Sequence, residues 1–264
     1  MYRALFAFSG ASDGVLRLLE AADFRARQLS PEYKVGCPPF CRRPLEETPC
    51  GRAGFPLLEH TLYSNSAKLW AFAESRGGFP DPPAPVDLPG LAFAPRPPPD
   101  GDPAPSLTVA YTASYVQWRY DADKGLYFRR QDGRAHTDAN TGLTLTAANV
   151  AVIFVPHVVT DILEDTVGYN RSTGKGGHYG LQIQLWGSGP ALLLRDGQAY
   201  SATWVRFERD SALGLVVSGG QRLPLKPGNT WFQIVPADST TAASGGRWNV
   251  KAVRPPDTPF GNDE

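Results

Sequence analysis

Residues 111–133 read YTASYVQWRYDADKGLYFRRQDG, and this stretch decides the fold class for most of the chain. Apolar and polar side chains alternate up to Tyr120, which is typical of a β-strand with one buried face. A turn sequence, DADKG, separates this strand from a returning strand at residues 126–130. Asp132 and Gly133 then form a second hairpin signal. The stretch therefore predicts antiparallel β-structure.

The same pattern continues toward the C-terminus. Asp196-Gly197 and Gly219-Gly220 are further turn signals. The strands expected between and around these turns are Val150–Val159, Leu181–Leu185, Leu192–Arg195, Ala199–Phe207, Trp231–Val235 and Trp248–Val253. Many short strands with turns at this spacing predict a sandwich or a barrel-like domain.

The N-terminal part of the chain has a different pattern. Residues 3–8 predict one short strand, and apolar residues then recur at helical spacing from Val15 to Leu19. A second helix is expected after Ser64, carrying Leu69 and neighbouring aromatic residues. These elements are too few for an independent doubly wound sheet, so we expect a partial α/β region that does not fold alone.

A proline-rich segment lies between the two parts, because prolines crowd together from residue 79 to residue 106. Proline blocks both helices and strand ladders, so this segment is expected to be a linker with almost no secondary structure. The predicted fold class is α+β. Its divisions are a partial α/β region at 1–78, a Pro-rich linker at 79–106, a β-rich domain at 107–254 that folds alone, and a disordered tail at 255–264.

Composition limits the classes of function. The 264 residues carry 26 basic and 26 acidic side chains, a net charge of +0, which argues against a nucleic-acid partner. Nowhere does the sequence contain the roughly 20 consecutive apolar residues of a membrane-spanning helix. The first ten residues, MYRALFAFSG, do not form a visible signal sequence. The chain is therefore either cytoplasmic or lacks its true N-terminus.

Three cysteines cluster at Cys37, Cys41 and Cys50. One local disulfide has three possible pairings and leaves one thiol over. Free thiols are a second possibility, and a zinc site with His60 as a fourth ligand is a third. We expect no cofactor and no metal.

Residues 10–14, GASDG, match the G-x-S-x-G motif of hydrolase nucleophiles and lie between a predicted strand and a predicted helix. That serine normally follows several core strands, which are missing here. We therefore interpret Ser12 as a helix N-cap whose hydroxyl accepts a backbone N–H, and we predict no catalytic residue.

A polar cluster at residues 134–142 is a candidate ligand site. On an extended chain His136, Asp138 and Asn140 point the same way and could hold a metal or a sugar. The alternative is a hairpin end in which Asp138 and Asn140 bind their own backbone. For a shared site we expect these residues to lie within reach of Asn149 or Asp161.

Two strand tryptophans extend the list of candidates. Trp186 and Trp204 lie on strand faces shared with Gln184 and Arg206, so they could bind a ligand, although core packing is the commoner use of tryptophan. The candidate ligand-binding residues are His136, Asp138, Asn140, Asn149, Trp186, Trp204 and Arg206.

Seven segments together resemble the YerB-like family of bacterial lipoproteins, which has no settled function. In order they are Phe6–Ser12, Glu59–Asn65, Gly133–Asp138, Leu145–Val150, Leu185–Ala191, Thr203–Arg206 and Pro227–Trp231. The resemblance implies an N-terminal α/β region followed by a β-rich domain. It implies a membrane-anchored, extracytoplasmic location, and an N-terminal truncation here, because family members begin with a lipoprotein signal and further sequence.

The expected function is that of a non-enzymatic cell-envelope protein which binds cell-wall material or a membrane-protein partner. The main alternative is a hydrolase or transferase acting on envelope glycan or peptide. The two differ in one feature, because an enzyme needs a cleft that joins polar groups with perturbed pKa values.

Overall fold

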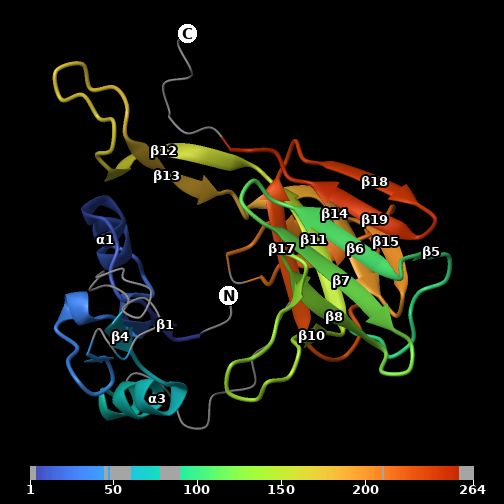
Figure 1. Ribbon diagram of the computed structural model, residues 1–264, viewed down its shortest axis with the longest axis horizontal. Helices are drawn as coiled ribbons and strands as arrows, with labels where there is room; N and C mark the ends of the chain where they lie inside the picture. The colour runs from blue at the N-terminus through green and yellow to red at the C-terminus, as the bar shows by residue number, and fades with distance from the viewer. Residues whose placement is uncertain (1–3, 45–46, 48–60, 78–89, 210, 256–264) are drawn as a thin grey trace.

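The computed structural model describes residues 4–44, 47, 61–77, 90–209 and 211–255 (Figure 1). The described residues of the N-terminal region form two helices and short strands beside a larger β-sandwich, and a two-stranded arm extends from the sandwich toward the first helix. The predicted α+β class is confirmed, and the β-rich part is a sandwich of two packed sheets.

The N-terminal region is a small βαβ unit with a short antiparallel pair beside it. Its elements are β1 (Phe6–Ala7), α1 (Asp13–Glu20), the 3-10 turns η1 (Arg25–Arg27) and η2 (Pro31–Tyr33), β2 (Gln28–Leu29), β3 (Cys41–Arg42), β4 (Leu62–Tyr63) and α3 (Ser66–Ser75). Strands β1 and β2 pair in parallel, and β3 pairs antiparallel with β4. Both predicted helices are present.

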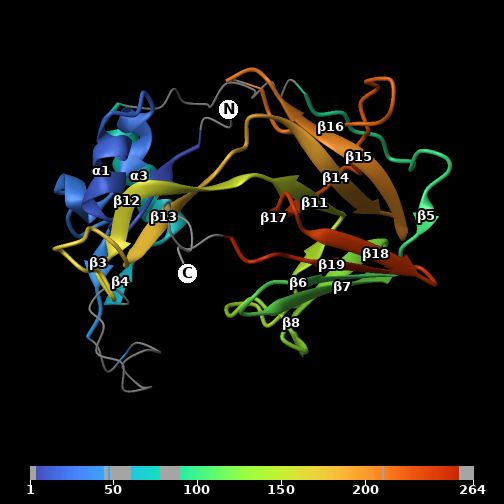
Figure 2. The ribbon, with the colours of Figure 1, turned by 90° about the horizontal axis from the view of Figure 1, so that it is seen from above.

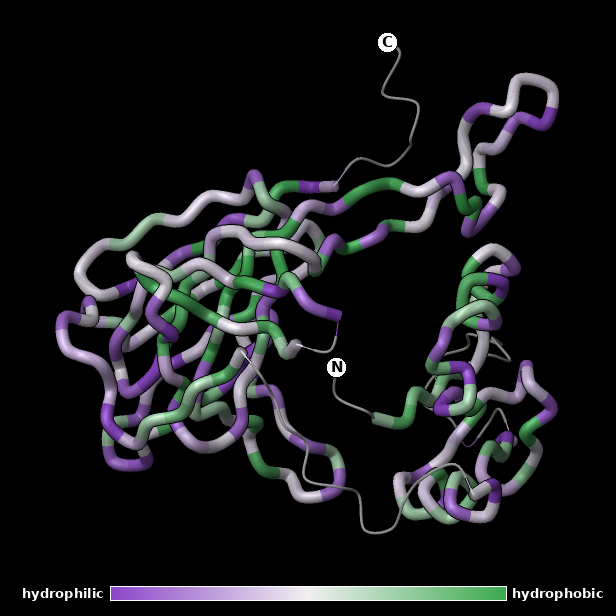
Figure 3. The backbone as a smooth tube through the Cα atoms, turned by 180° about the vertical axis from the view of Figure 1, so that it is seen from behind, coloured by the Kyte–Doolittle hydropathy of each residue, from purple (hydrophilic) through white to green (hydrophobic). Residues whose placement is uncertain are grey.

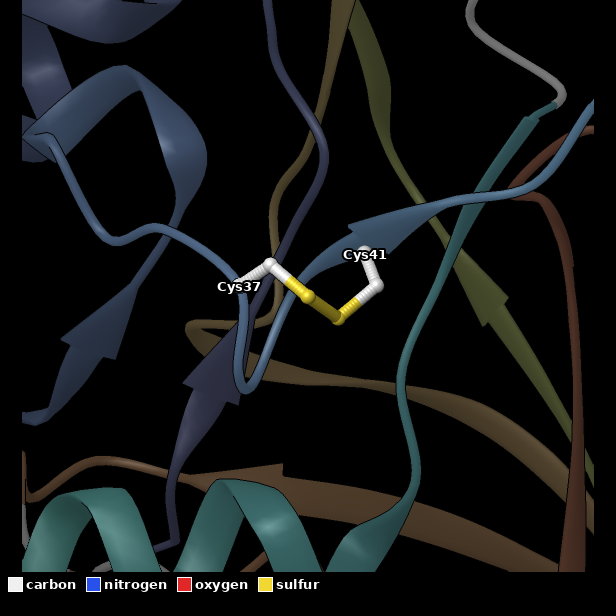
Figure 4. The surroundings of a disulfide bond; sticks show 2 residues. All are labelled: Cys37 and Cys41. Carbon is white, nitrogen blue, oxygen red and sulfur yellow. A yellow bond between two sulfur atoms is a disulfide. The ribbon is translucent and has the colours of Figure 1, made fainter.

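The buried core of this region is small, consisting of Leu29, Val35, Phe40 and Ala73. A disulfide between Cys37 and Cys41 closes the loop that leads into β3 (Figure 4). Of the three cysteine arrangements that the sequence left open, the structure has the local disulfide. Cys50 and His60 lie outside the described residues.

The first sheet of the sandwich has the strand order β10-β8-β7-β6-β19-β18, with β9 added on β8. Its strands are β6 (Ser106–Ala110), β7 (Tyr115–Asp121), β8 (Leu126–Gln131), β9 (Arg134–Ala135), β10 (Thr146–Ala147), β18 (Thr240–Ser244) and β19 (Arg247–Lys251). Alternation in β7 and β8 buries one face of this sheet and leaves the other exposed, as the sequence of residues 111–133 predicts.

The second sheet has the order β16-β15-β14-β11-β17, with β5 added on β15. Its strands are β5 (Asp102–Pro103), β11 (Asn149–Val155), β14 (Gly187–Arg195), β15 (Gln198–Arg206), β16 (Gly214–Val216) and β17 (Thr230–Pro236). Figure 2 shows the two sheets as layers. Each sheet is mixed, because β19 pairs in parallel with β6 and β17 pairs in parallel with β11.

The arm arises where Pro156 divides the apolar run that the sequence predicts as one strand. Proline has no N–H to donate to a ladder, so β11 ends at Val155. The chain then leaves the sandwich as β12 (His157–Asp165), which pairs with β13 (His178–Ile183). In the described part of the chain these two strands pair with no other strand. Figure 3 shows apolar stretches along the arm, outside the sandwich.

The second sheet is covered on both faces. One face packs against the first sheet around Trp118, Val152 and Leu194. The other face packs under irregular chain, which contributes Leu213, Leu223 and partly buried Leu91 to a second core.

The part of the predicted linker that the structure describes, residues 90–106, contains strand β5, the first residue of β6 and a single bridge between Phe93 and Leu225. Its first half, residues 90–99, lies against the second sheet. Buried Arg195 on β14 donates to the carbonyls of Ala94 (3.0 Å) and Pro95 (3.4 Å). We call residues 90–99 the strap. The predicted tail falls outside the described residues from 256 onward.

Candidate functional site

Within the predicted trio of His136, Asp138 and Asn140, the side chains of His136 and Asp138 bond to different partners. His136 accepts a hydrogen bond on Nδ1 from Nη1 of Arg129. The Asp138 carboxylate accepts the backbone N–H groups of Asn140 (3.1 Å) and Thr141 (2.8 Å), and these bonds with the Thr141 hydroxyl lower the pKa of Asp138. The hairpin-end interpretation therefore describes Asp138, and the shared polar face that alternation predicts is absent because the chain turns at this position.

Asn149 is fully buried and committed to structure. Its amide nitrogen donates to the Lys226 carbonyl (2.8 Å) and the Thr230 hydroxyl (3.1 Å), while its amide oxygen accepts the Lys226 N–H (2.7 Å). These bonds fasten β11 to the chain that enters β17. They leave the Asn149 side chain no free group to offer a ligand.

The two candidate tryptophans differ in burial. Trp204 is fully buried, and its indole N–H donates to the Phe154 carbonyl at 2.8 Å, so the expectation of a ligand contact at Trp204 is corrected. The Trp204 side chain packs in the second core, on the side of the second sheet that the strap covers. Trp186 is 55% exposed at the base of the arm. The Arg206 guanidinium lies 5.6 Å from the centre of the Trp186 ring and donates to the Leu185 carbonyl.

A buried arginine that the sequence analysis did not select lies between the sheets. Arg129 is 6% exposed, and its guanidinium lies 4.7 Å from the ring centre of Trp231. Its Nη1 also donates to Gln131 at 3.0 Å, while its Nε is buried without a partner in the described chain. Burial lowers the pKa of Arg129. The signal was present, because alternation in β8 places Arg129 on the same inward face as Tyr127.

Polar groups beside Arg129 bond to one another. With its amide oriented to satisfy its neighbours, Gln233 accepts the indole N–H groups of Trp118 (3.2 Å) and Trp231 (3.1 Å) and donates to the Tyr111 hydroxyl (2.7 Å). Burial raises the pKa of Tyr111 to about 12. This network lies between the sheets, where Tyr111 and Trp231 are partly buried, and it links β17 to the first sheet.

An open groove lies between helix α1 and the arm. We call it the arm groove, and its volume is about 640 Å³. It is lined by Val15, Leu18, Thr160, Asp161, Ile162, Glu164, Tyr179, Gly180, Leu181 and Gln182. Figure 2 shows α1 beside β12 and β13.

The two walls of the arm groove approach closely at Gly14 and expose apolar side chains elsewhere. At the contact, a Cβ added to Gly14 would lie 2.5 Å from Ile162, so glycine permits the close approach of α1 to β12. Leu18 on α1 is 62% exposed and Leu181 on β13 is 45% exposed. Asp161 and Glu164 add negative charge to the lining. The groove therefore combines apolar walls with acidic groups.

The described ranges contain neither a helix that could span a membrane nor a cluster of metal ligands. Neither helix there has the length and hydropathy needed to cross a bilayer. No three His, Cys, Asp or Glu side chains gather closely enough in those ranges to hold a metal ion.

Comparison with known proteins gives a consistent result. Residues 107–232 match the family described as "Protein of unknown function (DUF3048) C-terminal domain". YerB of Bacillus subtilis (strain 168), named as a candidate lipoprotein, is 26% identical over 131 residues. That alignment covers 50% of this chain and 34% of YerB, so this chain aligns with about a third of the length of its curated relative.

The crystal structure of the Bacillus subtilis YerB protein has the same fold. The TM-score is 0.61 at 21% identity, and the similarity covers 89% of this chain and 68% of that one. The resemblance predicted from the seven sequence segments is therefore confirmed: this chain is similar to Bacillus subtilis YerB in sequence and in fold, and its residues 107–232 match the DUF3048 C-terminal domain.

Proposed function

We propose that the chain is a non-enzymatic binding protein of the cell envelope, and that its arm groove binds an extended segment of a partner protein. The observation that carries the proposal is the pair of exposed leucines, Leu18 and Leu181, on opposite walls of one groove. Exposed apolar side chains that gather in one hollow are typical of sites that another molecule covers.

The arm offers backbone groups as well as side chains. Strands β12 and β13 pair only with each other in the described chain, so each presents an outer edge of N–H and C=O groups. An extended segment can add to such an edge as a further strand, with alternate side chains entering the groove. The acidic lining favours a segment in which apolar residues are accompanied by Lys or Arg.

Two observations support an envelope location. The curated relative is named as a lipoprotein, which is a class of membrane-anchored envelope protein. The disulfide between Cys37 and Cys41 fits an oxidising compartment outside the cytoplasm.

Site-specific photo-crosslinking tests the proposal in cells that produce the protein. A photoreactive residue at position 181 should give a discrete crosslinked product with one protein, and a second substitution, Leu18→Asp, should abolish that product. Leu143 is the matched control, because it is 70% exposed on a loop outside the arm groove. The same product from position 143, or no product from position 181, would contradict the proposal.

A further inference from the structure

A furrow runs along strand β6 on the exposed face of the first sheet. The outward side chains of β6 are small, whereas both neighbouring strands carry long polar ones. The outward residues are Ser106, Thr108 and Ala110 on β6, Tyr115, Gln117 and Arg119 on β7, and Arg247, Asn249 and Lys251 on β19. Small side chains between two taller rows leave a hollow of about 390 Å³, which we call the β6 furrow.

The strand register arranges the polar groups of the furrow in two rungs. Arg119 and Arg247 both lie opposite Ser106, so they face each other across the hollow. Adjacent strands are about 4.8 Å apart, which places the two arginine backbones about 10 Å apart. In the next rung Gln117 and Asn249 both lie opposite Thr108.

Positive charge is concentrated here although the whole chain has a net charge of +0. Neither Arg119 nor Arg247 forms an ion pair within the described chain. Asp121 lies two residues after Arg119 on the same face of β7, where its carboxylate accepts the Lys124 N–H (3.1 Å). The furrow therefore presents two guanidinium groups that form no ion pair in the described chain.

The hydrogen-bonding groups in the rungs are also uncommitted. In the part of the chain that the structure describes, no protein group bonds to the side chains of Thr108, Gln117, Arg119, Arg247 and Asn249. These side chains project from a continuous sheet, so their backbones are held in fixed positions. Together they supply two guanidinium groups, two amides and a hydroxyl.

We infer that the β6 furrow binds an anionic, hydroxyl-rich polymer. Guanidinium groups bind carboxylate or phosphate oxygens through paired N–H bonds, and amides with hydroxyls suit the alcohol groups between the anions. The two arginines complement the negative charges of such a polymer, and the polar lining of the furrow complements its hydroxyl groups. This site is separate from the arm groove, so either can be correct without the other.

Titration calorimetry of the full chain at low salt tests the inference with three probes. Polygalacturonate carries carboxylates, poly(glycerol phosphate) carries phosphates, and dextran is neutral. We expect at least one anionic polymer to bind and dextran not to bind, and the preferred anion identifies the natural chemistry. Binding of dextran with equal affinity, or no binding of either anionic polymer, would overturn the inference.

Two variants locate the binding. The double variant Arg119→Gln/Arg247→Gln should weaken polymer binding by at least about tenfold, because it removes two charge-assisted contacts. Thr108→Trp should weaken it similarly by filling the furrow with no change of charge. Arg171→Gln on the arm loop is the charge control for the single variants Arg119→Gln and Arg247→Gln, and it should have no effect. Equal losses in the control would show general attraction and would reject the furrow as the site.

A last variant separates this inference from the proposed function. Leu181→Asp alters the arm groove and should leave polymer binding unchanged. If Leu181→Asp also abolished polymer binding, a separate site on β6 would be rejected.

Discussion

The two sheets of the sandwich differ in how many of their faces are covered. Strand β7 of the first sheet alternates between buried and exposed residues, because its outer face meets water. Strand β11 of the second sheet is buried at every position from Asn149 to Val155. A strand with no polar face requires cover on both sides, and the second cover here is irregular chain.

The irregular chain over the second sheet is held in place by a buried arginine, Arg195. An irregular segment packed on a sheet has backbone carbonyls that need donors. Fully buried Arg195 donates to the carbonyls of Ala94 and Pro224, while Asp196 beside it accepts from Arg195 and from Lys226. The strap, residues 90–99, therefore packs as part of the domain that it precedes.

The largest effect should come from removing the strap. A piece spanning residues 90–254 should unfold cooperatively in urea, whereas a piece spanning 107–254 should lose cooperativity, because the strap face of the second sheet becomes exposed. This outcome would replace the sequence-based expectation that 107–254 folds alone, because the contacts of the strap indicate that the domain needs the residues before 107. Equal urea midpoints for the two pieces would show that the strap contributes nothing to folding.

A matched pair of substitutions compares the two outer faces directly. Ile153→Ala on β11 should destabilise the protein by about 3 kcal/mol, because Ile153 is buried in the second core. Thr108→Ala on the water-facing side of β6 should change stability by less than about 0.5 kcal/mol. Chemical denaturation measures both, and similar costs would contradict the difference between the sheets.

Removing the side chain that holds the strap should have a smaller effect on stability. Arg195→Met should cost about 2 kcal/mol, since the carbonyls of Ala94 and Pro224 lose their donors. The cost stays below that of a broken isolated ion pair because Asp196 keeps Lys226 at 2.6 Å. Faster proteolysis within residues 90–99 should accompany the loss. Unchanged proteolysis would separate Arg195 from the strap.

The interior between the sheets should make stability sensitive to alkaline pH. Burial raises the pKa of Tyr111 from 10.0 to about 12, so the folded state keeps its proton where the unfolded state has lost it. This contribution to stability is complete below pH 10 and is lost as the pH rises toward 12. Tyr111→Phe should therefore flatten the decline of unfolding free energy between these values. An identical slope in wild type and variant would refute this account.

Strands in which polar and apolar residues alternate were predicted more accurately than strands that are apolar throughout. Alternation identified β7 and β8 because one face of each meets water. The apolar run from Val150 to Val159 has no such contrast, so neither the break at Pro156 nor the double cover was foreseen. Trp204 remained a candidate for the same reason, since its cover comes from residues distant in the chain.

Two site residues show what local patterns can and cannot reveal. Arg129 could have been found, because a charge at an inward position of β8 is unusual. Asn149 could not, because its partners Lys226 and Thr230 lie almost 80 residues away along the chain, at separations of 77 and 81. The arm groove depends on the approach of α1 to β12, which no local pattern encodes.

The smallest expected effect concerns Ser12, which precedes α1 as its N-cap residue. The predicted cap bond is absent: the hydroxyl makes no capping bond and is buried without a partner in the described chain. Ser12→Ala therefore removes an unsatisfied group and should change stability by less than about 0.5 kcal/mol. Asn65 is the matched control, since its side chain accepts the Lys68 N–H at 2.9 Å, and Asn65→Ala should cost about 1 kcal/mol.

Thermal unfolding of the two variants tests this difference between caps, and a fluorophosphonate probe tests the chemistry of the same serine. A nucleophilic serine needs a base within hydrogen-bond reach, and no described residue bonds to the Ser12 hydroxyl. The probe should therefore leave Ser12 unlabelled. Stoichiometric labelling would show that a base reaches Ser12, and it would replace the binding function with hydrolase chemistry on envelope glycan or peptide. A loss of about 1 kcal/mol in Ser12→Ala would instead restore the capping role.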